Sequence, residues 1–136
     1  MADGTGRATA PGRSRRAGGQ ATVEFALALP VVVVALLLVI QVALVARSQI
    51  LVVNAARSGA RAAAVGESAE AAAAGSPGLD GGRLAVSVAG GGGPGAMVTV
   101  TVRYRSPTDV PLVGGLLGEP TVQASVTMRV EGPAPG

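Results

Sequence analysis

The sequence predicts an α+β protein in which a long N-terminal helix, membrane-spanning in its first half, packs on a small antiparallel sheet of about three strands. An uncharged apolar run over residues 25–46 leads into residues 47–65 without a turn signal, which predicts one continuous helix from about Val23 to Val65. Two later segments alternate apolar and polar residues, as half-buried strands do. Because three strands cannot hide their apolar face alone, we expect the outer half of the helix to cover it.

The apolar run is the expected membrane segment. Gln41 is its only strongly polar residue, and about 20 apolar residues are enough to cross the hydrocarbon core. The Arg-rich N-terminal flank predicts a cytoplasmic N-terminus and an extracytoplasmic C-terminus. Pro30 is tolerated in a membrane helix and can kink it. We therefore expect a single-pass protein of the inner, or cytoplasmic, membrane, in contact with membrane lipid.

A secretory signal peptide is a poorer explanation of this run. Its apolar region would be about 7–15 residues long and would end in small residues at alternate positions. The run is longer, and Leu44, Val45 and Ala46 do not give that pattern. An uncleaved signal anchor remains an alternative explanation of the apolar run.

The changes in composition along the chain divide it into six parts. They are a basic leader (1–19), which is cleavable if the resemblance given below holds, a transmembrane helix (20–46), its extension outside the membrane (47–65), a Gly/Ala-rich loop (66–82), an antiparallel β-meander (83–131) and a disordered tail (132–136).

The helix extension has two kinds of surface. Polar residues such as Arg47, Arg57 and Arg61 gather on one face, and the expected opposite face contains Ile50, Val53, Ala56, Ala60 and Ala64. Ala55, Gly59 and Ala63 recur every four residues and form a candidate docking strip, where another backbone could approach closely. An Ala-rich helix has small residues on every face, so the strip also has a neutral explanation.

The strongest strand signals lie over residues 98–104 and 122–130, and Leu84, Val86 and Val88 form a shorter third member. Val100, Val102, Val126 and Met128 should face the helix, with Thr101, Arg103, Thr127 and Arg129 exposed. Residues 90–95 read as a flexible hairpin connection. The other connection, 106–120, is apolar at Val110, Leu112, Val113, Leu116 and Leu117. It can cap the sheet, lie on the membrane surface or touch another subunit.

Composition argues against several classes of function. The chain has no His, Cys or Lys, so it lacks the usual metal ligands and nucleophile–base pairs. We expect no catalytic residues, no metal site and no cofactor. The net charge of +3 equals the side-chain excess of residues 1–19, and the remainder is balanced. With one Tyr and one Phe, nucleic-acid binding is not expected.

Glu24 is the residue that a plain anchor does not explain, because an acid at the edge of a span is costly and usually functional. It lies five residues after Gly19 and directly before Phe25. This arrangement resembles the cleavage site of type IV prepilins, and in particular the TadE-like family. Pro30, the Asn54–Arg57 and Gly59–Arg61 segments and the closing 126–129 segment support the resemblance, which extends over most of residues 19–131.

The resemblance implies a pilin-like fold and a minor pseudopilin of a tight-adherence type IV pilus or a pilus-like secretion apparatus. Its implied partners are a prepilin peptidase, other pilin or pseudopilin subunits and the assembly platform. It implies cleavage between Gly19 and Gln20, and pairing of Glu24, beside Phe25, with the new amine of Gln20. The alternative is an unprocessed single-pass anchor with a small extracytoplasmic β domain.

Overall fold

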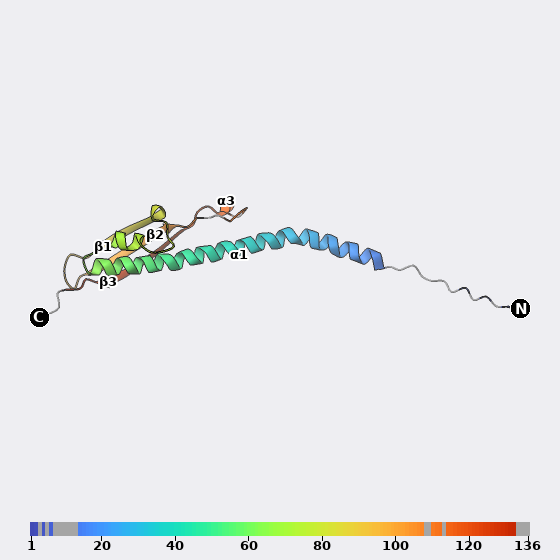
Figure 1. The fold of residues 1–136 in the computed structure, drawn as a ribbon, viewed down its shortest axis with the longest axis horizontal. Helices are drawn as coiled ribbons and strands as arrows, with labels where there is room; N and C mark the ends of the chain where they lie inside the picture. The colour runs from blue at the N-terminus through green and yellow to red at the C-terminus, as the bar shows by residue number, and fades with distance from the viewer. Residues whose placement is uncertain (3, 5, 7–13, 108–109, 113, 133–136) are drawn as a thin grey trace. The chain divides into compact units, whose positions relative to one another are not determined.

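The computed structural model describes residues 1–2, 4, 6, 14–107, 110–112 and 114–132. Val113, part of the expected apolar connection, lies outside these residues, as do residues 3, 5 and 7–13 of the expected leader and residues 133–136 of the expected tail. The elements, in chain order, are α1 (Ser14–Ala64), α2 (Ala69–Ala74), the 3₁₀ turn η1 (Gly81–Arg83), β1 (Leu84–Gly90), β2 (Met97–Arg105), α3 (Gly114–Leu117) and β3 (Thr121–Arg129) (Figure 1). The predicted α+β class is confirmed.

Contacts divide the chain into two compact units, residues 1–36 and 37–136. The first contains the beginning of α1, which starts at Ser14 rather than near the expected Val23. Residues 15–17 are two Arg and an Ala, which are good helix formers, and they offset the two glycines that follow. The helix continues through Pro30.

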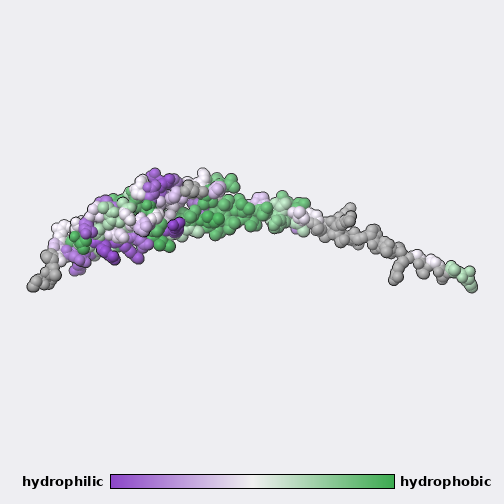
Figure 2. Space-filling view, in the orientation of Figure 1, coloured by the Kyte–Doolittle hydropathy of each residue, from purple (hydrophilic) through white to green (hydrophobic). Residues whose placement is uncertain are grey.

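Large apolar side chains of α1 are exposed along the apolar run, among them Leu27, Val31 and Val32 in the first unit. Figure 2 shows a hydrophobic surface, in green, over the apolar run of α1. By length and composition, α1 can cross a membrane: its most apolar window has a mean hydropathy of 3.0.

The second unit contains a three-stranded antiparallel sheet in the order β1-β2-β3. Val100 of β2 pairs with Val88 and Val126 in the register of the two neighbouring strands. Alternation decides which face is buried: Val98, Val100, Val102, Tyr104 and Val122 are inside. The opposite face carries hydrogen-bonded hydroxyl pairs. Thr99 Oγ1 lies 2.8 Å from Thr127 Oγ1, and Thr101 Oγ1 lies 2.7 Å from Ser125 Oγ. The predicted meander is confirmed.

The C-terminal part of α1 covers the apolar face of the sheet. Val52, Ala55, Ala56 and Ala60 are fully buried in one cluster with Val100 and Val102. Val126 and Met128 pack against the same cluster, as predicted. Arg103, Thr127 and Arg129 are exposed, as predicted, whereas Thr101 is half-buried.

The helix face expected opposite the polar residues is buried at Ala56, Ala60 and Ala64, but not at Ile50. Ile50 is 63% exposed, because the sheet lies against the neighbouring stripe of α1 that includes Val52 and Ala55. Small residues on that stripe let the backbone of the helix approach the strands.

Further contacts close this unit. Ser68 caps α2 by accepting a hydrogen bond from the Ala71 N–H at 3.1 Å, and Ala69 and Ala73 of α2 join the core. The Glu131 N–H donates to the Ala64 carbonyl at 2.9 Å, which ties the segment after β3 to the end of α1.

The hairpin between β1 and β2 depends on Gly90. Its φ is +82°, and a Cβ there would lie 2.4 Å from the Met97 carbonyl oxygen. Only glycine accommodates that backbone.

Candidate functional site

The residues of the expected processing site all lie on α1. Gly19, Gln20, Glu24 and Phe25 are exposed, and the Phe25 side chain is 68% exposed. Within the described residues, no ion pair involves Glu24. This segment therefore presents a carboxylate and an aromatic ring that the described part of the chain leaves uncovered.

The fold gives no reason for glycine at position 19. A Cβ built there would meet nothing within 4 Å, and its φ is not in the left-handed region. A glycine inside a helix costs about 1 kcal/mol relative to alanine. Nothing in the packing of the described residues offsets that cost.

The small-residue strip has a different environment. Ala55 and Gly59 are buried, and Ala63 is half-buried against the core. A Cβ on Gly59 would lie 3.1 Å from both the Ala69 carbonyl oxygen and Val100 Cγ1. The strip therefore lies against elements of its own chain, α2 and β2, and its docking to another subunit stays a prediction.

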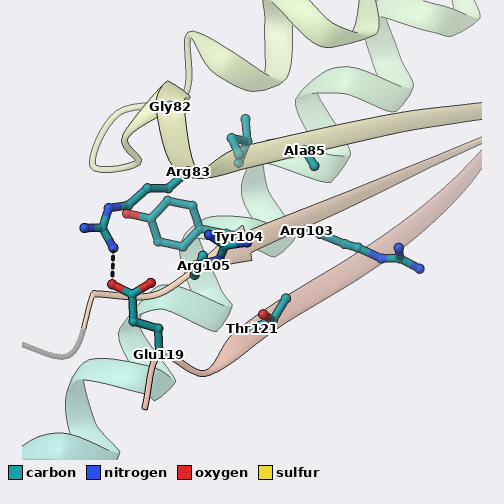
Figure 3. A pocket seen from close by; sticks show the side chains of 9 residues that line it. Gly82, Arg83, Ala85, Arg103, Tyr104, Arg105, Glu119 and Thr121 are labelled. Carbon is teal, nitrogen blue, oxygen red and sulfur yellow. Dashed lines mark hydrogen bonds and ion pairs between the residues drawn. The ribbon is translucent and has the colours of Figure 1, made fainter. Parts of the chain in front are cut away.

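A hollow at the start of β1 and the end of β2 brings together four charged side chains. Arg83, Arg103 and Arg105 line it together with Tyr104 and Glu119, and Figure 3 shows Arg83 reaching to the Glu119 carboxylate. Arg83 Nη1 donates to Glu119 Oε1 at 2.9 Å. This hydrogen bond and the Glu119 charge raise the pKa of Arg83. The pair joins the residue before β1 to the end of the 106–120 connection and so stabilises the fold.

No described group of three His, Cys, Asp or Glu side chains could hold a metal ion. The hollow offers guanidinium groups and one carboxylate already paired with Arg83.

Gln41, the polar residue noted in the apolar run, is buried, which the sequence analysis did not predict. It is 4% exposed, and within the described residues its Oε1 has no hydrogen-bond partner. The sequence signal that could have predicted this burial is an isolated amide side chain inside an apolar run.

Comparison with known families agrees with the sequence features. Residues 19–61 match the family model described as TadE-like protein, which confirms the resemblance over that segment. The match begins at Gly19, includes Glu24 and Phe25, and ends before α2 and the sheet. It relates this segment to a pilus-associated family. No curated protein and no solved structure gives a significant match.

Proposed function

We propose that this chain is a TadE-like minor pseudopilin. A prepilin peptidase cleaves it between Gly19 and Gln20, and the mature chain takes part in assembling a tight-adherence type IV pilus or a pilus-like secretion apparatus. The observation that carries the proposal is the spacing of Gly19 and Glu24 on an exposed, apolar helix within the segment that matches the TadE-like family.

Gly19 supports the processing step. The described packing does not require a glycine there, and the residue lowers helix stability. A peptidase that binds extended backbone in a narrow cleft would benefit from both the missing Cβ and the easier local unwinding. Glycine at position 19 would then be required by the peptidase cleft and not by the fold of the chain.

Glu24 supports the assembly step. A carboxylate beside an apolar run is costly unless it is paired, and none of the described ion pairs involves it. Cleavage after Gly19 would create a positive α-amino group on Gln20, about 6 Å away along the helix axis. Pairing within the chain or with a neighbouring subunit would neutralise both charges, and pairing between chains would fix the axial register.

The exposed part of the apolar run supports the membrane location. Its large side chains have no cover within the described chain, and lipid or the helices of other pilin subunits would cover them. The mature chain would sit in the cell membrane with its sheet unit on the extracytoplasmic side, and its partners would be the peptidase, pilin subunits and the assembly platform.

The replacement Glu24→Gln tests the assembly role. We expect the variant to insert and to be processed, but to lose co-purification with pilin subunits and to fail to restore pili. Glu24→Asp keeps the charge and should retain much of the activity. Glu67→Gln makes the same chemical change at an exposed acid after α1 and is the matched control. Normal assembly of Glu24→Gln would favour the alternative, an unprocessed anchor with a small β domain.

A further inference from the structure

The connection between β2 and β3, residues 106–120, is fastened at its base. The Ser106 N–H donates to the Pro120 carbonyl at 3.0 Å, which closes the connection on itself. The hydroxyl groups of Ser106 and Ser48 lie 2.9 Å apart, which fixes the same point to α1. The Arg83–Glu119 pair adds a third fastening on the side of β1.

From this base the connection lies back along the apolar run of α1. Pro120 lines an apolar hollow together with Gln41, Val42, Val45 and Ala46. Gln41 is 4% exposed, although its chain neighbours Ile40 and Val42 are 42% and 69% exposed. Since Ser48 lies seven residues after Gln41, the cover extends about 10 Å from the base toward the N-terminal side of the helix. In the view of Figure 1, α3 lies beyond the ends of the strands of this second unit.

The connection turns large apolar side chains outward. Leu112 is 74% exposed and Leu116 is 86% exposed. Leu112 also has a φ of +68°, which is unusual for a bulky residue and favours glycine instead. No charged residue occurs from residue 110 to residue 118. A loop in water would gain nothing from this composition.

Two arginines mark the level at which the apolar surface ends. Arg47 and Arg105 directly precede the two serines that share the hydroxyl contact, and both are exposed. Arginine side chains at the end of a membrane helix place their charge among the lipid head groups. The uncharged run of α1 ends at this level, and Leu112 and Leu116 belong to the uncharged stretch 110–118 of the connection.

We propose that the exposed leucines of this connection insert into the membrane, with Leu112 and Leu116 among the acyl chains of the outer leaflet of the bilayer that α1 spans. The inference rests on the membrane location in the proposed function. The occupant is lipid because the exposed leucines continue the lipid-facing surface of the same helix and the charges begin where that surface ends. The loop also shields the Gln41 amide, which would be costly in hydrocarbon.

The insertion has a consequence for the sheet unit. A helix alone can tilt and rotate in the bilayer, but a second contact beside it restricts the rotation. The sheet would then present its hydroxyl-bearing outer face in a fixed direction relative to the membrane.

Single-cysteine spin labelling tests the insertion, since the chain has no native cysteine. Leu112→Cys and Leu116→Cys are made in the full chain, reconstituted in vesicles of phosphatidylethanolamine and phosphatidylglycerol. Nitroxide relaxation is measured with oxygen, which concentrates in lipid, and with a water-soluble nickel complex. Leu38→Cys is the lipid reference and Thr127→Cys, on the outer face of the sheet, is the water reference; both positions are exposed.

Labels at 112 and 116 should behave like the label at 38, with a ratio of oxygen to nickel accessibility well above that at 127. A ratio like that at 127 would overturn the inference while leaving the proposed function intact. Low accessibility to both reagents would also overturn it, because it would show that protein, such as a second copy of the chain, covers the loop. A water-accessible label at 38 would overturn the membrane location itself.

Discussion

Two stretches of α1 differ in which apolar side chains are exposed and which are buried. Along the apolar run of α1, the large side chains such as Leu27 and Val31 are exposed, whereas Ala56 and Ala60 near its C-terminal end are fully buried. In a helix whose cover lies within its own chain, the large apolar residues would be the buried ones. The described chain leaves the first stretch uncovered, and the sheet covers the second.

The difference also separates two kinds of sequence constraint. Near the C-terminal end of α1, residue size is explained by packing against β2 and α2. Near Gly19 and Glu24 the described packing explains neither residue, and both are accounted for by the peptidase and the subunits that the proposed function requires.

The largest expected effect comes from placing a charge in the core between the sheet and the C-terminal part of α1. Val100→Asp puts a carboxylate at a fully buried position between strand and helix, which should destabilise the sheet unit by more than about 4 kcal/mol. Thr101→Asp, one residue along on the other face, should cost about 1 kcal/mol through strand propensity. Limited proteolysis of the extracted protein measures both, and equal sensitivity of the two variants would show that the face assignment is wrong.

Two glycines in α1 sharpen the comparison. Gly59→Val adds a branched side chain where a Cβ already meets Ala69 and Val100 at 3.1 Å, so we expect a loss of about 1–3 kcal/mol in stability. Gly19→Val meets nothing in the described chain and should leave thermal unfolding of the sheet unit unchanged.

The same pair should respond in the opposite way in a processing assay. Gly19→Val should slow cleavage by the peptidase, whereas Gly59→Val should be cut normally. A Gly19→Val chain cut at the normal rate would remove the functional reason given for that glycine.

A smaller effect is expected at the hydroxyl contact that fastens the 106–120 connection. Ser48 Oγ donates to the Leu44 carbonyl at 3.1 Å as well as contacting Ser106, so Ser106→Ala leaves Ser48 with a partner. Ser48→Ala instead deprives the buried Ser106 hydroxyl of this contact. We expect the free energy of unfolding to fall by about 1–2 kcal/mol for Ser48→Ala and by about 0.5–1 kcal/mol for Ser106→Ala. Thermal unfolding of the extracted variants gives the order, and a larger loss for Ser106→Ala would contradict it.

The sequence predicts the strands well because a period of two assigns each residue to one face. The segments 98–104 and 122–130 correspond to β2 (Met97–Arg105) and β3 (Thr121–Arg129). The buried face of the Ala-rich helix could not be found in the same way. Small residues occur all around it, so the pattern placed Ile50 inside when the sheet lies against the stripe containing Val52 and Ala55.

The candidate processing site could be predicted from the sequence because its signal is local spacing. Gly19, Glu24 and Phe25 needed no tertiary contact to be recognised. The cover over Gln41 could not be predicted, because it depends on how a connection more than 60 residues later lies along the helix. The apolar residues of that connection were visible, but their place beside α1 was not.

The most direct test of the proposed function is the intact mass of the protein extracted from membranes of cells that contain the cognate prepilin peptidase. We predict a chain that begins at Gln20, with Glu24 at its fifth position, and full-length protein in cells without the peptidase. A mass that retains residues 1–19 in the presence of the peptidase would contradict the account and leave the chain an unprocessed membrane anchor.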